Sequence, residues 1–139
     1  MKKFTLSLFF SLLGLGSIYK SNAQANNDIF TMALTGDAII TRKLSVYDEA
    51  PFLEMIKLIR SADVAFTNFE MLLHDYEPYP MHKSGGTYMR AKPSMAKELV
   101  WAGFDMVSTA NNHTGDYGTQ GMRLTLKYLN DYGLVNAGA

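Results

Sequence analysis

The stretch KELVWAGFDMVSTANNHTGDYG, residues 97–118, contains three kinds of local pattern in direct succession. Its first part has apolar residues at helical spacing, and Gly103 is placed to end that helix. Residues 104–110 then form a mostly apolar run that predicts a strand. The polar loop ANNHTGDYG, residues 110–118, follows directly. A helix, a strand and a loop of Asn, Asp and His side chains in this order indicate an α/β protein with chemistry at a strand end.

The segments before and after this stretch repeat the alternation of strand and helix. Apolar runs at 29–34, 64–67 and 134–136 predict further strands, and helices are expected after Pro51, from Pro93 to Gly103, and over 119–132. The first helix has an apolar face of Phe52, Met55, Ile56 and Ile59, and the last one of Met122, Leu126 and Leu129. The order βαβαβαβ predicts right-handed crossovers and a mainly parallel sheet.

Residues 71–90 are the exception to this alternation. Pro78, Pro80 and the pair Gly85-Gly86 interrupt every periodic pattern, so the segment is expected to be a long loop. Its two histidines, His74 and His82, are expected to lie in solvent.

Residues 1–25 have the composition of a secretory signal peptide. Lys2 and Lys3 precede an uncharged apolar run over 4–18, and small residues stand at Ala23 and Ala25, where a signal peptidase would cleave. The run is shorter than the roughly 20 residues of a membrane-spanning helix. We therefore expect an exported protein, periplasmic or at the cell surface, that begins after one of these alanines.

Charge and cysteine content narrow the classes of partner. The chain has 13 basic and 13 acidic residues, and loss of the lysines in the signal peptide leaves the remainder acidic. Nucleic acid is therefore not an expected partner. The chain has no Cys, so neither disulfides nor thiolate metal ligands are available.

Side chains that can bind metal or transfer protons follow three successive strands. They are Asp37 after the first strand, Asn68 and Glu70 after the second, and Asn111, Asn112 and His113 after the third. Since parallel strands end at the same edge of a sheet, we expect these side chains to converge. Carboxylates, carboxamides and an imidazole form a ligand set for one or two divalent cations, with Mn²⁺, Fe²⁺, Zn²⁺ and Mg²⁺ all compatible. Glu70 is the candidate to bridge two ions.

Two further residues near these strand ends have alternative roles. Asp116 precedes the helix over 119–132, where its carboxylate would bind free N–H groups of the first turn. In the alternative, it orients His113 from behind. Arg90 is a candidate contact for an anionic substrate.

The motifs TGD at 35–37 and ADVAFTNFE at 62–70, together with residues 97–129, resemble the CapA-type family of capsule synthesis proteins. The likeness runs from about Phe30 to Ala139. Members of that family are associated with poly-γ-glutamate, and their fold resembles the calcineurin-like metallophosphoesterases. The resemblance implies that residues 26–139 are the N-terminal half of an α/β/β/α sandwich, truncated before the remaining histidine ligands.

The resemblance also implies roles for individual residues. Asp37, Glu70 and Asn112 match metal ligands, with Glu70 between two ions. His113 matches the histidine that acts on the leaving group or on the phosphoryl oxygens. Asn68, Asn111, Asp116 and Arg90 would bind substrate or support these residues.

Three functions are compatible with these observations. The first is the synthesis or export of a capsular or poly-γ-glutamate polymer, together with membrane-bound synthesis proteins. The second is a dinuclear metal-dependent phosphoesterase. The third is a binding module that holds an anionic polymer without cleaving it. Residues 26–139 are expected to be inactive alone, because the metal site would be incomplete.

Overall fold

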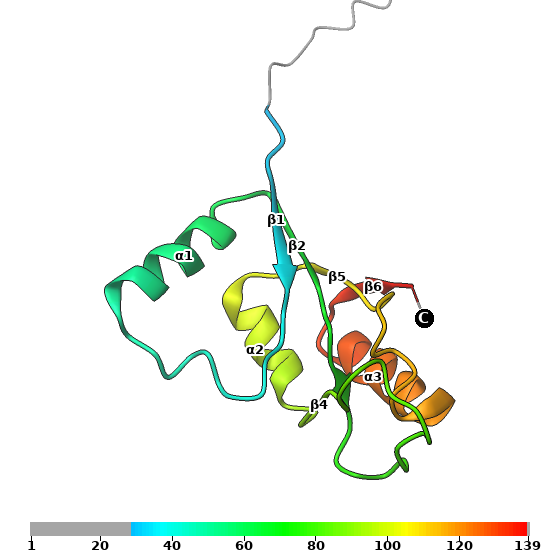
Figure 1. Cartoon of the computed structure of the whole chain (residues 1–139). Helices are drawn as coiled ribbons and strands as arrows, with labels where there is room; N and C mark the ends of the chain where they lie inside the picture. Colours follow the sequence, from blue (N-terminus) through cyan, green and yellow to red (C-terminus); the bar gives the residue numbers. More distant parts are fainter. Residues whose placement is uncertain (1–28, 139) are drawn as a thin grey trace, which may run out of the picture.

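The structure, a computed structural model, describes residues 29–138, so the predicted signal peptide lies outside the described residues (Figure 1). Its strands are β1 (Met32–Asp37), β2 (Val64–Asn68), β3 (Leu72–Leu73), β4 (Arg90–Ala91), β5 (Met106–Ser108) and β6 (Val135–Ala137). Its helices are α1 (Ala50–Arg60), α2 (Met95–Ala102) and α3 (Gly118–Asp131). None of these helices is long and apolar enough to cross a membrane.

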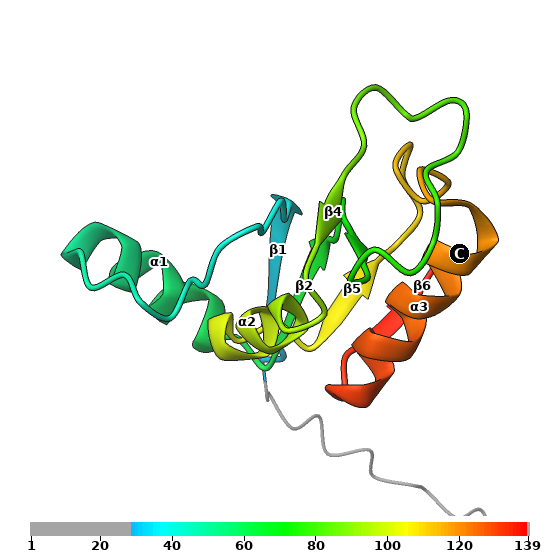
Figure 2. The same cartoon turned by 90° about the horizontal axis from the view of Figure 1, so that it is seen from below.

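Four strands form one sheet in the order β1-β2-β5-β6, and each adjacent pair is parallel. A helix connects each of these strands to the next, and every connection advances in the same direction across the sheet. Right-handed crossovers that all advance in one direction place their helices on one face. Figures 1 and 2 show α1, α2 and α3 side by side along the sheet. The predicted α/β class with a mainly parallel sheet is confirmed, and it is consistent with the N-terminal part of a metallophosphoesterase-like sandwich.

The two faces of this sheet differ in burial. Ala65, Thr67 and Val107 point to the helices and are at most 2% exposed. On the opposite face, the register aligns Leu34 with Phe66, Phe66 with Met106, and Met106 with Val135. This row of apolar side chains crosses all four strands, and its end members Leu34 and Val135 are 69% and 58% exposed. One face of the sheet therefore carries the core and the other remains open.

Helices α2 and α3 end where the sequence predicts. Gly103 follows α2 with φ 100°, and Gly133 lies just beyond α3 with φ 77°. Both values lie in the left-handed region, where a residue without Cβ ends a helix at the lowest cost. Leu99 in α2 and Leu129 in α3 are fully buried.

Helix α1 packs less completely. Ile56 and Ile59 of its predicted apolar face are buried, but Met55 is 48% exposed. A cavity of about 270 Å³ lies between α1, the segment after β1 and the sheet. Spacing alone predicts the apolar face, and the structure leaves part of it unfilled.

The prediction of one long loop over 71–90 is wrong at both of its ends. Strands β3 and β4 pair there as a two-stranded parallel sheet. His74, expected in solvent, is 0% exposed, because its backbone N–H binds the carbonyl of Ala91 and its ring packs 4.1 Å from the ring of Tyr117. Two-residue strands are too short to show a period in the sequence. His82 is exposed, as expected.

Candidate functional site

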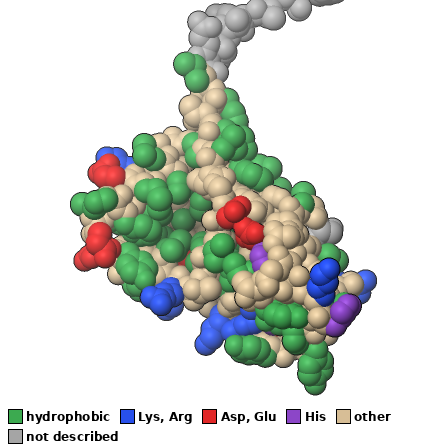
Figure 3. Space-filling model, viewed as in Figure 1, with side chains coloured by type: hydrophobic (Ala, Val, Ile, Leu, Met, Phe, Trp, Pro, Cys, Tyr) green, Lys and Arg blue, Asp and Glu red, His purple; other side chains and the backbone are tan. Residues whose placement is uncertain are grey.

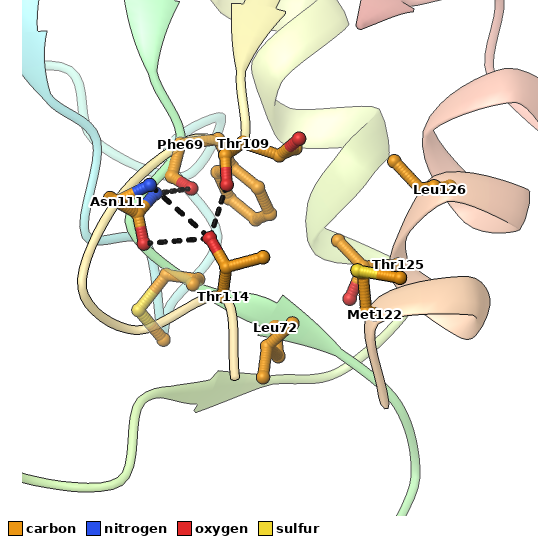
Figure 4. Close-up of a pocket in the computed structure, with 9 residues that line it drawn as sticks. Phe69, Leu72, Thr109, Asn111, Thr114, Met122, Thr125 and Leu126 are labelled. Atoms are coloured by element: carbon orange, nitrogen blue, oxygen red, sulfur yellow. Dashed lines mark hydrogen bonds between the residues drawn. The ribbon is translucent and has the colours of Figure 1, made fainter. Parts of the chain in front are cut away.

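The carboxyl ends of β1, β2 and β5 bring the predicted polar residues together. Asp37 is aligned with Asn68 across the strands. The Asn68 amide Nδ2 donates to Asp37 Oδ1 at 2.7 Å, and its Oδ1 accepts from Asn111 Nδ2 at 3.2 Å. Asn111 also donates to the carbonyl of Phe69 at 3.0 Å, and Figure 4 shows its side chain turned toward Phe69 and Thr114. Asn68 and Asn111 thus connect three strand ends through their carboxamides.

An acidic pair lies beside this connection. The Glu70 side chain is 15% exposed, and its Oε1 is 3.8 Å from Nε2 of His113. Burial raises the pKa of Glu70, as do a hydrogen bond and charge repulsion from the neighbouring Asp37, whereas His113 lowers it. Figure 3 shows acidic side chains next to a histidine near the middle of one face, beside an apolar hollow. Two carboxylates therefore share a small volume next to an imidazole.

The opposite edge of the His113 ring is bound to Asp116. Nδ1 of His113 lies 2.8 Å from Asp116 Oδ2, and the two residues are 7% and 1% exposed. The Asp116 carboxylate also accepts from the backbone N–H groups of Gly85 at 2.9 Å and Met89 at 2.8 Å.

The expectation that Asp116 caps the following helix is therefore wrong. The residue before α3 is Tyr117, and no side chain caps that helix. The carboxylate of Asp116 turns instead toward segments that are distant in sequence. Its contact with His113 is the one that the alternative role requires.

Two predicted site residues make their contacts elsewhere. Asn112 is exposed, and its Nδ2 donates to the carbonyl of Gly85 at 2.9 Å. Arg90 donates to the carbonyl of His74 at 2.6 Å and lies with its guanidinium 3.7 Å from the centre of the Tyr76 ring. Arg90 thereby stabilises its own segment, while Asn112 faces the 81–89 segment.

Sequence reasoning missed the contribution of Gly85 and Met89. The pair Gly85-Gly86 predicts a break in the chain, and it was also the available signal for a close approach of two backbones. Met89 contributes a backbone N–H, which every residue except proline possesses, so no pattern in the sequence could reveal it.

Asp37 and Glu70 fit the acidic part of a divalent-cation site. Adjacent carboxylates repel each other, and hard divalent cations prefer oxygen ligands of this kind. Within residues 29–138, however, no group of three or more His, Asp or Glu side chains comes together as a cation site. The two carboxylates would hold a cation from one side only, and the other ligands would have to be carboxamides, water or residues outside this range.

The model of the bacterial capsule synthesis protein family, PGA_cap, matches residues 25–139, which include every strand and helix described above. The chain belongs to this family. It is also 38% identical over 128 residues to the uncharacterized proteins y4sH and y4uA of Sinorhizobium fredii. It is 28% identical over 120 residues to the capsule biosynthesis protein CapA of Bacillus anthracis.

These relatives are much longer than the aligned region. The match to y4sH covers 90% of this chain but 28% of the relative, and the match to CapA covers 81% of this chain and 29% of CapA. The match to the capsule synthesis family thus covers almost the whole chain, whereas the chain spans less than a third of the length of the curated relatives it matches.

Proposed function

We propose that this chain belongs to an exported capsule synthesis protein that binds an anionic polymer, of the poly-γ-glutamate kind, through divalent cations held by Asp37 and Glu70. Membership of the capsule synthesis family supports a role in capsule synthesis. One structural observation carries the site: Glu70 lies beside Asp37 and 3.8 Å from His113, at the strand ends of a parallel sheet. Membrane-bound proteins that synthesise the polymer are the proposed partners.

The acidic pair Asp37 and Glu70 can bind an anionic ligand only when a cation is present. Asp37 and Glu70 alone would repel a carboxylate or phosphate group. A cation between protein and ligand would neutralise both sides and polarise a ligand oxygen. Asn68 holds the carboxylate of Asp37 in place, and His113 Nε2 is close enough to the acidic pair to bind the same ligand or to exchange a proton with it.

A second candidate function, metal-dependent phosphoester hydrolysis, is favoured by the setting of His113. One edge of the His113 ring is bound to the buried carboxylate of Asp116, and the other edge faces Glu70. This is the arrangement of a general acid or base. In such a reaction His113, protonated on both ring nitrogens, would donate its Nε2 proton to the leaving oxygen and keep Nδ1–H toward Asp116. His113→Asn should then lower hydrolysis by roughly 10²–10⁴, the usual range for a lost proton-transfer group.

Parallel measurements on the whole protein distinguish these functions. Binding of poly-γ-glutamate and hydrolysis of a phosphodiester such as bis(p-nitrophenyl) phosphate are measured with Mn²⁺, with Mg²⁺ and with EDTA. The first proposal predicts cation-dependent polymer binding that Asp37→Asn and Glu70→Gln both weaken. Polymer binding unchanged by EDTA would contradict it. Metal-dependent hydrolysis would favour the phosphoesterase, and polymer binding that persists in EDTA without hydrolysis would favour the binding module.

Export has its own test. N-terminal sequencing of the protein recovered from outside the cytoplasm should give Gln24 or Asn26 as the first residue. Recovery of a mature product that still begins at Met1 would contradict the proposed cleavage.

A further inference from the structure

Residues 81–89, which we call the clamp segment, contain no helix or strand, yet they are bonded to the His113 loop at several points. The backbone N–H of Met81 donates to the carbonyl of Asp116 at 2.8 Å. The N–H groups of Gly85 and Met89 donate to the two carboxylate oxygens of Asp116. In return, Asn112 Nδ2 donates to the carbonyl of Gly85. In Figure 2 the two segments project side by side from the same end of the molecule.

The approach at Gly85 leaves no room for a side chain. A Cβ at this position would lie 2.1 Å from the carbonyl oxygen of Asn112 and 2.6 Å from its carbonyl carbon. These are backbone atoms, so they cannot turn aside as the end of a flexible side chain could. In contrast, a Cβ at Gly115, in the His113 loop itself, would meet nothing within 4 Å. Gly115 is therefore a matched control for the same chemical change.

The bonds to Asp116 determine which nitrogen of His113 carries the proton. Asp116 is 1% exposed, its two oxygens accept the backbone N–H groups of Gly85 and Met89, and its Oδ2 lies 2.8 Å from Nδ1 of His113. An ionised carboxylate can only accept, so the ring must donate from Nδ1. In the neutral ring, Nε2 then presents its lone pair toward Glu70, 3.8 Å away.

We propose that the clamp segment sets the tautomer and direction of the His113 ring, and that Gly85 is the positioning residue that allows it to dock. The purpose of the clamp rests on the proposed function: it keeps the Nε2 lone pair directed at the cation site of Asp37 and Glu70. The tautomer itself is a property of the fold. A bond from a neutral donor to a buried carboxylate should favour the Nδ1–H form by at least about tenfold.

The test is a long-range ¹H–¹⁵N correlation spectrum of the whole protein, labelled with ¹⁵N-histidine, without added metal at a pH where the rings are neutral. In the unaltered protein, His113 should show a protonated Nδ1 and a bare Nε2. Gly85→Ala should raise the Nε2–H fraction by about tenfold or more, because Asp116 then loses part of its support. Gly115→Ala should leave the spectrum of His113 unchanged.

Each result bears on the inference. A protonated Nε2 in the unaltered protein would overturn it, and so would a folded Gly85→Ala variant that keeps the Nδ1–H form. If Gly85→Ala does not fold, amide exchange in the unaltered protein decides, since the Gly85 and Met89 amides should exchange slowly only when bound to Asp116. An Nδ1–H ring in a protein that binds neither metal nor polymer would support the clamp and refute the proposed function. Metal-dependent polymer binding by a protein with a protonated Nε2 would support the proposed function and refute the clamp.

Discussion

At the histidine end of the candidate site, Asp116 is 1% exposed, accepts the backbone N–H groups of Gly85 and Met89 and lies against Nδ1 of His113, and the clamp segment bonds to the loop. At the acidic end, Asp37 accepts a side-chain hydrogen bond from Asn68 and borders a cavity of about 270 Å³ under α1. The histidine end is therefore ordered without a ligand. The acidic end carries like charges and is loosely packed, which suits a part of the site that adapts when a cation binds.

Truncation of one core side chain in each of the helices α3 and α1 should show the largest effect. Leu129 in α3 is fully buried, and Ile56 in α1 is 2% exposed and borders the cavity. We expect Leu129→Ala to lower the free energy of unfolding by about 4 kcal/mol and Ile56→Ala by about 2 kcal/mol, because loosely packed α1 can move into the vacated space. Urea denaturation measures both values, and equal losses would mean that α1 is packed as tightly as α3.

Removal of the buried carboxylate should have the next largest effect. Asp116→Ala leaves two backbone N–H groups and the His113 ring without their acceptor, so we expect a loss of about 3 kcal/mol in the free energy of unfolding. Asp75, whose side chain is 64% exposed, provides the control, and Asp75→Ala should change stability by less than about 0.5 kcal/mol. A loss for Asp116→Ala no greater than that for Asp75→Ala would refute the tight histidine end.

His74, which packs against Tyr117 at the histidine end, should make stability depend on pH. Burial, and after it the charge of Arg90, lower the pKa of His74, while Glu77 and Asp75 oppose them. Because the unfolded chain then binds a proton more readily, the stability contribution of neutral His74 is present above the unfolded pKa of about 6.5 and falls as pH drops toward the folded pKa. The urea midpoint should therefore decline less between pH 7.5 and 5.5 in His74→Gln than in the unaltered protein. Identical declines would mean that His74 titrates normally.

The smallest change in metal-free stability is expected at the acidic end. Glu70→Gln removes one of two repelling charges, so in EDTA the melting temperature should stay the same or rise slightly. With Mn²⁺ in excess, the unaltered protein should gain stability and the variant should gain little. The affinity for Mn²⁺ should fall by at least about tenfold, the lower end of the loss for a merely supporting residue. A destabilised variant in EDTA, with unchanged affinity, would make Glu70 a structural residue.

Much of the fold can be read from the sequence because its signals are local. The apolar runs and the helical spacing predicted the main strands and helices, and Gly103 and Gly133 ended α2 and α3 as expected. Strand ends also predicted that Asp37, Asn68, Glu70 and His113 would converge, since the direction of a parallel strand determines where the next polar residue lies.

Only the tertiary structure decided the setting of these residues. Asp116 was expected to cap the adjacent helix, but its acceptors serve Gly85 and Met89, which are 31 and 27 residues away. His74 was expected in solvent, but it is buried between a two-residue strand and Tyr117. Of the neighbouring asparagines, Asn111 turned to Asn68, and Asn112 turned to Gly85. Periodicity reports which face of one element is apolar. The partner of a buried polar group depends on which distant backbone arrives there with free N–H and C=O groups, and side-chain patterns do not record that.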